Sequence, residues 1–172
     1  MDHRIYAPAT GLDTWKQRLA EPDTQWVRTK SAFETAVFCE VGAREPGGLH
    51  PRVTALLDRE ELLRDCDLIA SFPEHRVRLP GGSRASQTDV WAMLRGPRGL
   101  ISLAVEGKSG ETFAETIGEW RKEASNGKEK RLAFLCDQLG VPQGVNDTIR
   151  YQLMHRTASA PSRPNASVLS QL

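Results

Sequence analysis

The fold is decided by the stretch DVWAMLRGPRGLISLAVEGK, residues 89–108. It holds two apolar runs, 89–94 and 100–105, whose lengths and branched or aromatic side chains favour strands. The intervening Gly96-Pro-Arg-Gly99 is typical of a tight turn, so we predict a β-hairpin. The second run is almost wholly apolar, which predicts a central strand buried on both faces.

Charged residues occupy the ends of this hairpin that meet in space. Asp89 opens the first strand, and Glu106-Gly-Lys108 follows the second. In an antiparallel hairpin the start of one strand lies beside the end of the next, so we expect both carboxylates and the ammonium at one end of the sheet. Carboxylate oxygens suit Mg²⁺, and a neighbouring lysine can orient water or offset charge on a phosphate. A solvated salt bridge at the strand ends would explain the same residues, and Glu74 is a rival for the first acid.

Helical and extended patterns come before the hairpin. Ser31-Ala-Phe-Glu34 is a capping box that predicts the start of a helix. Pro51 suits the first turn of the next helix. The segments 68–72 and 75–79 have the short apolar or alternating pattern of strands.

After the hairpin the apolar residues return to helical spacing. One predicted helix ends at Gly140, and the last one is capped by Asn146 or Asp147. The apolar face expected on this last helix consists of Ile149, Leu153 and Met154. Helices, about three strands and further helices predict an α/β fold (α+β by the order of its elements), with a small central sheet flanked by helices.

The length of 172 residues predicts one domain. We place it at 1–159, with 1–30 as an N-terminal helical extension. The last segment, 160–172, is small, polar and contains Pro, so we expect a flexible C-terminal tail.

Charge is divided unevenly along a chain whose net charge is only +1. Residues 1–73 hold 9 basic and 12 acidic side chains, a net of −3, whereas 74–172 hold 14 and 10, a net of +4. This balance excludes a purely electrostatic nucleic-acid binder, and it places any anionic partner at the basic second half. Exposed arginines beside the hairpin could contact phosphate: Arg76, Arg78, Arg84, Arg95 and Arg98.

No apolar stretch approaches the length of a membrane span, and the N-terminus lacks the apolar run of a signal peptide. The three cysteines are scattered, with no CxxC pair. We therefore expect a cytoplasmic protein that has no membrane partner.

The chain resembles the PD-(D/E)xK nuclease superfamily, whose fold is called restriction-endonuclease-like. The resemblance rests on Asp89, on Glu106-Gly-Lys108 at the end of an apolar strand, and on an αβββα order, and it covers roughly residues 30–157. It implies that Asp89 and Glu106 bind Mg²⁺ (or Mn²⁺) and that Lys108 assists the water that attacks a DNA phosphodiester. The chain differs at Thr88, where Pro is usual, and offers only 166–169 as the strand expected after the central helix.

The same resemblance suggests further site residues. Many members of the superfamily carry an acid on the first core helix, which would be Glu34. Some carry a Gln with a basic neighbour on a later helix, which would be Gln152 with His155 and Arg156. These three fall at i, i+3 and i+4 and so share one helix face.

Two functional hypotheses follow. The first is a Mg²⁺-dependent endonuclease that acts on DNA rather than RNA, with Lys108 and Gln152 as catalytic residues. Cutting both strands of a duplex needs two sites, which favours a homodimer. The alternative is a non-catalytic binding or interaction protein that retains the nuclease-like scaffold. A third interpretation is an unrelated α+β fold in which the ExK motif has no functional role.

Overall fold

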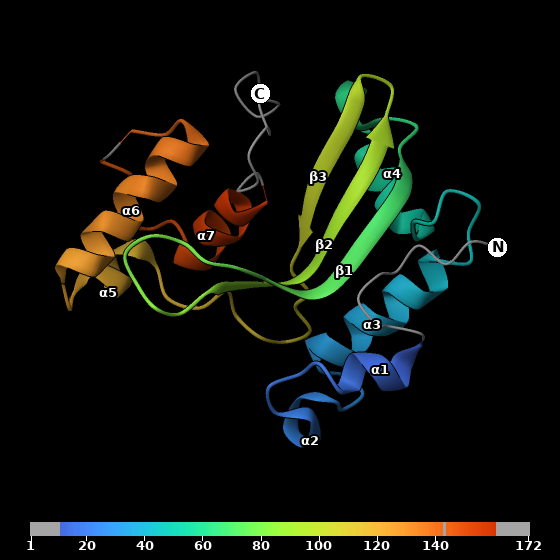
Figure 1. Ribbon diagram of the computed structural model, residues 1–172, viewed down its shortest axis with the longest axis horizontal. Helices are drawn as coiled ribbons and strands as arrows, with labels where there is room; N and C mark the ends of the chain where they lie inside the picture. Colours follow the sequence, from blue (N-terminus) through green and yellow to red (C-terminus); the bar gives the residue numbers. More distant parts are fainter. Residues whose placement is uncertain (1–10, 143, 161–172) are drawn as a thin grey trace. The chain divides into compact units, whose positions relative to one another are not determined.

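A computed structural model describes residues 11–142 and 144–160 of the chain (Figure 1). It is an α+β structure with a small antiparallel sheet and several helices. The elements in chain order are α1 (Leu12–Lys16), α2 (Pro22–Gln25), α3 (Ser31–Gly42), α4 (Pro51–Leu57), the 3₁₀ helix η1 (Glu61–Leu63), β1 (Asp67–Val77), β2 (Ser86–Gly96), β3 (Gly99–Val105), α5 (Ile117–Arg121), α6 (Asn126–Leu139) and α7 (Tyr151–Ser159).

The sheet has three strands in the order β1-β2-β3. Strands β2 and β3 pair antiparallel, from Val90 opposite Val105 to Gly96 opposite Gly99, which confirms the predicted hairpin. The central strand is β2, and not β3 as its apolar sequence predicted. The side chains of β3 are accordingly half-buried or exposed, whereas most of those on β2 are buried.

The two extended segments predicted before the hairpin, 68–72 and 75–79, belong to one strand, except that residues 78 and 79 follow its end at Val77. Strand β1 runs without a break through Pro73 and Glu74. Glu74 has φ of 52°, in the left-handed region that residues other than glycine rarely adopt. The sequence predicted two short runs because Pro73 and Glu74 separate two extended patterns, although the strand continues through them.

The chain divides into two compact units. Two of the boundaries fall inside β1 and β2, and the third lies after β3, between Glu111 and Thr112. Among the described residues, the first unit contains 11–75 and 89–111, and the second contains 76–88 and 112–160.

In the first unit, helices pack against one face of the sheet. Leu57 of α4 joins Leu68 of β1 and Leu94 of β2 in one buried cluster, which agrees with the position of α4 beside the sheet in Figure 1. A second cluster joins α1, α3 and β2 through Trp15, Ala36 and Val90. These clusters fix the sheet against α3 and α4, the helices that begin where the sequence predicted them.

In the second unit, α6 packs against α7 around its own buried cluster. Leu132, Leu135 and Cys136 of α6 lie there, and Gly140 ends the helix with φ of 62°, as predicted. The buried Arg131 side chain donates to the backbone carbonyls of Leu79, Pro80 and Arg84. The guanidinium thereby fixes the segment 79–84 to α6.

The last helix differs from its prediction. Helix α7 begins at Tyr151, because Asn146 accepts hydrogen bonds from Thr148 instead of capping the helix. Met154 is buried as expected, but Ile149 and Leu153 are 38% and 45% exposed. Across the described ranges, no helix combines the length and apolar character needed to cross a membrane.

Candidate functional site

The hairpin brings Asp89 and Glu106 together where β3 ends. Asp89 does not open its strand as predicted, because β2 begins three residues earlier, at Ser86. Val90 pairs with Val105, so the next position outward on each strand is Asp89 on β2 and Glu106 just after β3. The backbone N–H of Gly107 donates to Asp89 Oδ2 at 2.8 Å. This hydrogen bond holds the aspartate against the chain segment that carries the glutamate and the lysine.

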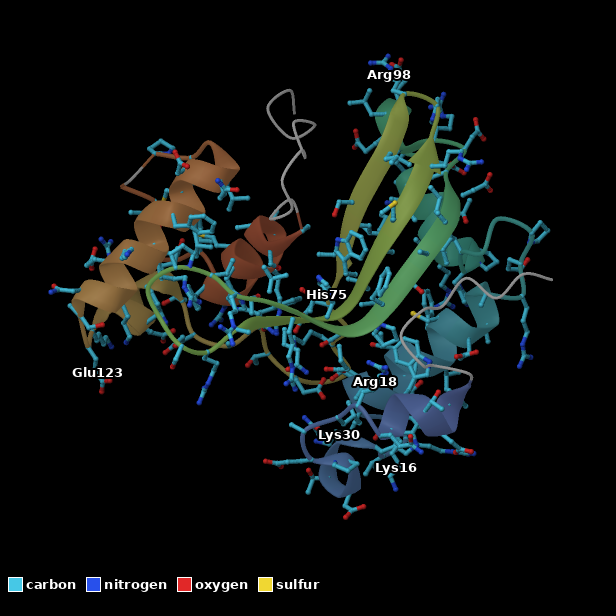
Figure 2. All side chains as sticks on the ribbon, viewed as in Figure 1. Lys16, Arg18, Lys30, His75, Arg98 and Glu123 are labelled. Atoms are coloured by element: carbon cyan, nitrogen blue, oxygen red, sulfur yellow. The ribbon has the colours of Figure 1, made fainter. Side chains whose placement is uncertain are left out.

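Lys108 completes the predicted group. Its Nζ donates to Glu106 Oε1 at 3.1 Å, and the two side chains are only 21% and 11% exposed. The structure therefore brings Asp89, Glu106 and Lys108 together, as the spacing predicted. Low exposure distinguishes the Lys108–Glu106 ion pair from the Arg98–Glu61 ion pair, whose side chains are 68% and 79% exposed. Figure 2 shows Arg98 at the tip of the hairpin.

Electrostatics at the site favour a proton or a cation. Burial is the main reason that the pKa of Asp89 rises from 3.8 to about 6, and the Glu106 carboxylate raises it further. The Gly107 N–H and the Lys108 ammonium act in the opposite direction. Desolvation and a nearby like charge both penalise an ionised carboxylate, so a bound cation would stabilise this group of residues.

Glu74 belongs to the same neighbourhood. Its carboxylate on β1 also raises the pKa of Asp89, so the two candidates for the first acid lie within electrostatic reach of each other. The left-handed backbone at Glu74 occurs at this point of β1. Strained conformations of this kind are common next to functional sites.

The donor set fits Mg²⁺ bound through carboxylates and water. Mg²⁺ is usually held by one or two carboxylates, with waters and substrate phosphate completing an octahedron. Asp89 and Glu106 could supply the two carboxylates. In the part of the chain that the structure describes, no group of three or more His, Cys, Asp or Glu side chains is arranged to hold a metal ion. Any metal here would therefore depend on water and substrate for most of its ligands.

The segment after β3 is fixed to α3. Gly107 packs so closely against Thr35 that a Cβ at Gly107 would overlap the threonine hydroxyl. Glu111 accepts hydrogen bonds from the Ser31 N–H at 3.3 Å, from the Ser31 hydroxyl at 3.1 Å and from the Ser109 N–H at 2.7 Å. These bonds lower the pKa of Glu111 to about 2, and the bond from the Ser109 N–H has the largest effect. Sequence analysis missed Glu111, because its partner Ser31 is 80 residues away.

Glu34 has a structural role that differs from the predicted capping box. Helix α3 is preceded by Lys30 as its N-cap residue, and Ser31 makes no capping bond because its hydroxyl binds Glu111. The exposed Glu34 carboxylate accepts from the Thr29 N–H at 2.9 Å. Glu34 thus ties down the chain ahead of α3.

The other three predicted residues lie on α7, in the second unit. His155 Nδ1 is 2.9 Å from the buried Ser86 hydroxyl, and Arg156 donates to the same hydroxyl at 3.3 Å. Burial and then the Arg156 charge lower the pKa of His155 to about 4, so the imidazole is neutral at pH 7. Gln152, His155 and Arg156 are all half-buried. Their catalytic or DNA-binding roles stay predictions.

A family described as a domain of unknown function, DUF6946, matches residues 8–167. The chain belongs to the DUF6946 family. The DUF6946 match covers both compact units and every candidate site residue, and its description names no activity. No curated protein and no solved structure matches the chain.

Proposed function

We propose that this DUF6946 protein is a Mg²⁺-dependent endonuclease-like enzyme (Mn²⁺ could replace Mg²⁺) that hydrolyses phosphodiester bonds in DNA. The observation that supports it is the convergence of Asp89, Glu106 and Lys108 in a partly buried group where β3 ends. The αβββα order and the antiparallel sheet are compatible with a restriction-endonuclease-like core.

Each residue of the group has a defined task in this proposal. Asp89 and Glu106 would bind the ion, and the Gly107 N–H keeps Asp89 turned toward Glu106. When bound, Mg²⁺ supplies a positive charge that polarises the phosphate and lowers the pKa of a water. Lys108, which is 3.1 Å from Glu106, would orient the attacking water or stabilise the negative charge that develops on the phosphate. Gln152 would help to orient water or DNA.

Contacts to the DNA backbone would come from exposed arginines near the strands. Arg76, Arg78, Arg84, Arg95 and Arg98 are all exposed. Arginine suits phosphate because its planar guanidinium presents two parallel donors. Cleavage of both strands would require two copies of the site, so we also propose a homodimer on DNA.

The test is cleavage of plasmid and linear DNA by purified protein in Mg²⁺, in Mn²⁺ and in a chelator. We expect metal-dependent cleavage that Lys108→Ala reduces by about 100-fold or more, the usual loss when a charge-stabilising donor is removed. Lys122→Ala, which removes an exposed lysine at the end of α5, is the matched control and should cleave normally. Equal rates for the wild type and Lys108→Ala, with both proteins folded, would disprove the assignment.

The second candidate is a non-catalytic binding protein on the same scaffold. It is favoured by the lack, within the described residues, of a group of three metal-binding side chains. Calorimetric titration with Mn²⁺ separates the two. An enzyme should bind the ion, and Asp89→Asn and Glu106→Gln should each weaken binding. Unchanged binding in both variants, together with no cleavage, would favour the non-catalytic protein.

A further inference from the structure

The first unit contains a cavity beside the candidate site. Its volume is about 280 Å³, and it lies between α3, α4 and the face of the sheet. Phe38 of α3, Val53 of α4 and Leu68, Ala92 and Leu103 of the sheet are among its walls. The walls are mainly apolar, as is typical of pockets that hold organic ligands.

The cavity is continuous with the candidate site. Gly107 and Lys108 line it, and the same two residues contact Asp89 and Glu106 through the hydrogen bonds described above. A group attached to a phosphate at the carboxylates would therefore lie beside the cavity. The cavity and the site belong to the same compact unit.

The lining combines aromatic surface with isolated polar groups. The rings of Phe38 and His50 stack with centroids 3.8 Å apart and both line the cavity. Burial raises the pKa of Cys39 to about 12, so its thiol adds neutral surface. Ser71 is 4% exposed and also lines the cavity, where its hydroxyl adds a polar group to the mainly apolar wall.

We propose that this cavity receives one unpaired base of the substrate strand, next to the phosphate that is cut. A base is flat and largely apolar on its faces, and its polar edge could satisfy the Ser71 and Thr35 hydroxyls. The cavity volume of about 280 Å³ is enough to hold a small flat ring system such as a single base. The inference rests on the proposed function and narrows its substrate to single strands, or to duplexes with an extruded nucleotide.

Two measurements on intact protein test this proposal. The first is binding of a short labelled single strand in a chelator, followed by fluorescence anisotropy, with the matching duplex as comparison. The second is Mg²⁺-dependent cleavage of the same single strand with and without one abasic position at the nucleotide that is cut. Val53→Phe fills the cavity from α4, and Leu56→Phe is the control, because Leu56 lies on the same helix and is 59% exposed.

We expect Val53→Phe to weaken single-strand binding about tenfold or more, and the abasic strand to be cut slower by a similar factor, as for the loss of one stacked base. Leu56→Phe should change neither. Cleavage that is insensitive to Val53→Phe and to the abasic position would overturn the cavity proposal and leave the endonuclease intact. Base-dependent binding that Val53→Phe abolishes, without any cleavage, would support the cavity and refute the endonuclease. Neither binding nor cleavage would refute both.

Discussion

Asp89 is a carboxyl group that folding makes harder to ionise. Its pKa rises to about 6, first through burial and then through Glu106 and Glu74. An acid with a raised pKa in the folded state stabilises the fold only while it is protonated. The favourable contribution is complete below the ordinary pKa of 3.8 and is lost as pH rises through about 6.

Asp89→Asn should therefore be more stable than the wild type at neutral pH. Asn keeps an oxygen that can accept from the Gly107 N–H but removes the buried charge. We expect the variant to gain about 2 kcal/mol in the free energy of unfolding at pH 8, and to gain nothing at pH 4. Urea titrations between these pH values measure the difference, and the exposed Asp137→Asn is the control.

Mg²⁺ should reduce the advantage of Asp89→Asn at pH 8, because the ion would stabilise the ionised aspartate of the wild type. A gain that is equal at pH 4 and pH 8 would contradict the burial of this charge.

At the residue scale, the hairpin spacing was enough to predict that Asp89, Glu106 and Lys108 meet. That prediction is local, because the register of a tight hairpin fixes which strand ends lie together. The proximity of Glu74 to Asp89 depends on the pairing of β1 with β2 and on the left-handed backbone conformation of Glu74. The sequence indicates neither of these.

Among the elements, the segment that follows β3 owes its position to the N-terminus of α3. Glu111 is bonded to the Ser31 N–H and hydroxyl there, and also to the Ser109 N–H of its own segment. A carboxylate at a helix N-terminus is favoured by the helix dipole as well as by the bonds. The contact keeps Lys108, one residue before Ser109, close to α3.

Glu111→Gln should loosen this segment in a pH-dependent way. An acid with a lowered pKa stabilises the fold when it is ionised, so the contribution is present above 4.5 and is lost as pH falls through about 2. We expect the wild type to exceed Glu111→Gln by about 1 kcal/mol at pH 7, with the gap closing below pH 4.5. Urea unfolding measures this gap, and the exposed Glu115→Gln should behave like the wild type. A gap as large at pH 2.5 as at pH 7 would contradict the ionic contact.

Elements with local signals were predicted well, and those that depend on tertiary partners were not. The hairpin and the Gly140 end of α6 follow from turn and cap chemistry in a few residues. The capping box at Ser31 failed because a distant carboxylate competes for its hydroxyl. The apolar β3 is an edge strand of the three-stranded sheet. Its composition did not predict this position, because an apolar run is compatible with several places in a sheet.

The whole molecule has a division that composition does not reveal. Residues 76–88 belong with 112–160, although 89–111 separates them in the chain. Sequence patterns relate residues that are neighbours along the chain. They therefore predicted one domain over 1–159 and gave no sign that 76–88 belongs with a later segment. That prediction of one domain can be tested by unfolding.

We expect both units to unfold in one transition, because β1 and β2 cross the boundary as continuous strands without a linker. Cys66 is buried in the first unit and Cys136 in the second, and both are free thiols. Their reaction with a thiol reagent across a urea series, read by peptide mass spectrometry, should show the same midpoint. Two separate midpoints would mean that the units are independent domains.

The stacking of Trp120 on Tyr151, with ring centroids 4.1 Å apart, gives the second unit a spectroscopic label of its own. The chain has four tryptophans, and Trp15, Trp26 and Trp91 all lie in the first unit. Fluorine-labelled tryptophan should therefore give four resonances, and Trp120→Phe would identify the one from the second unit. Ligands that bind at Asp89, Glu106 and Lys108 should shift resonances of the other three tryptophans. Events in the two units can then be followed separately in a single sample.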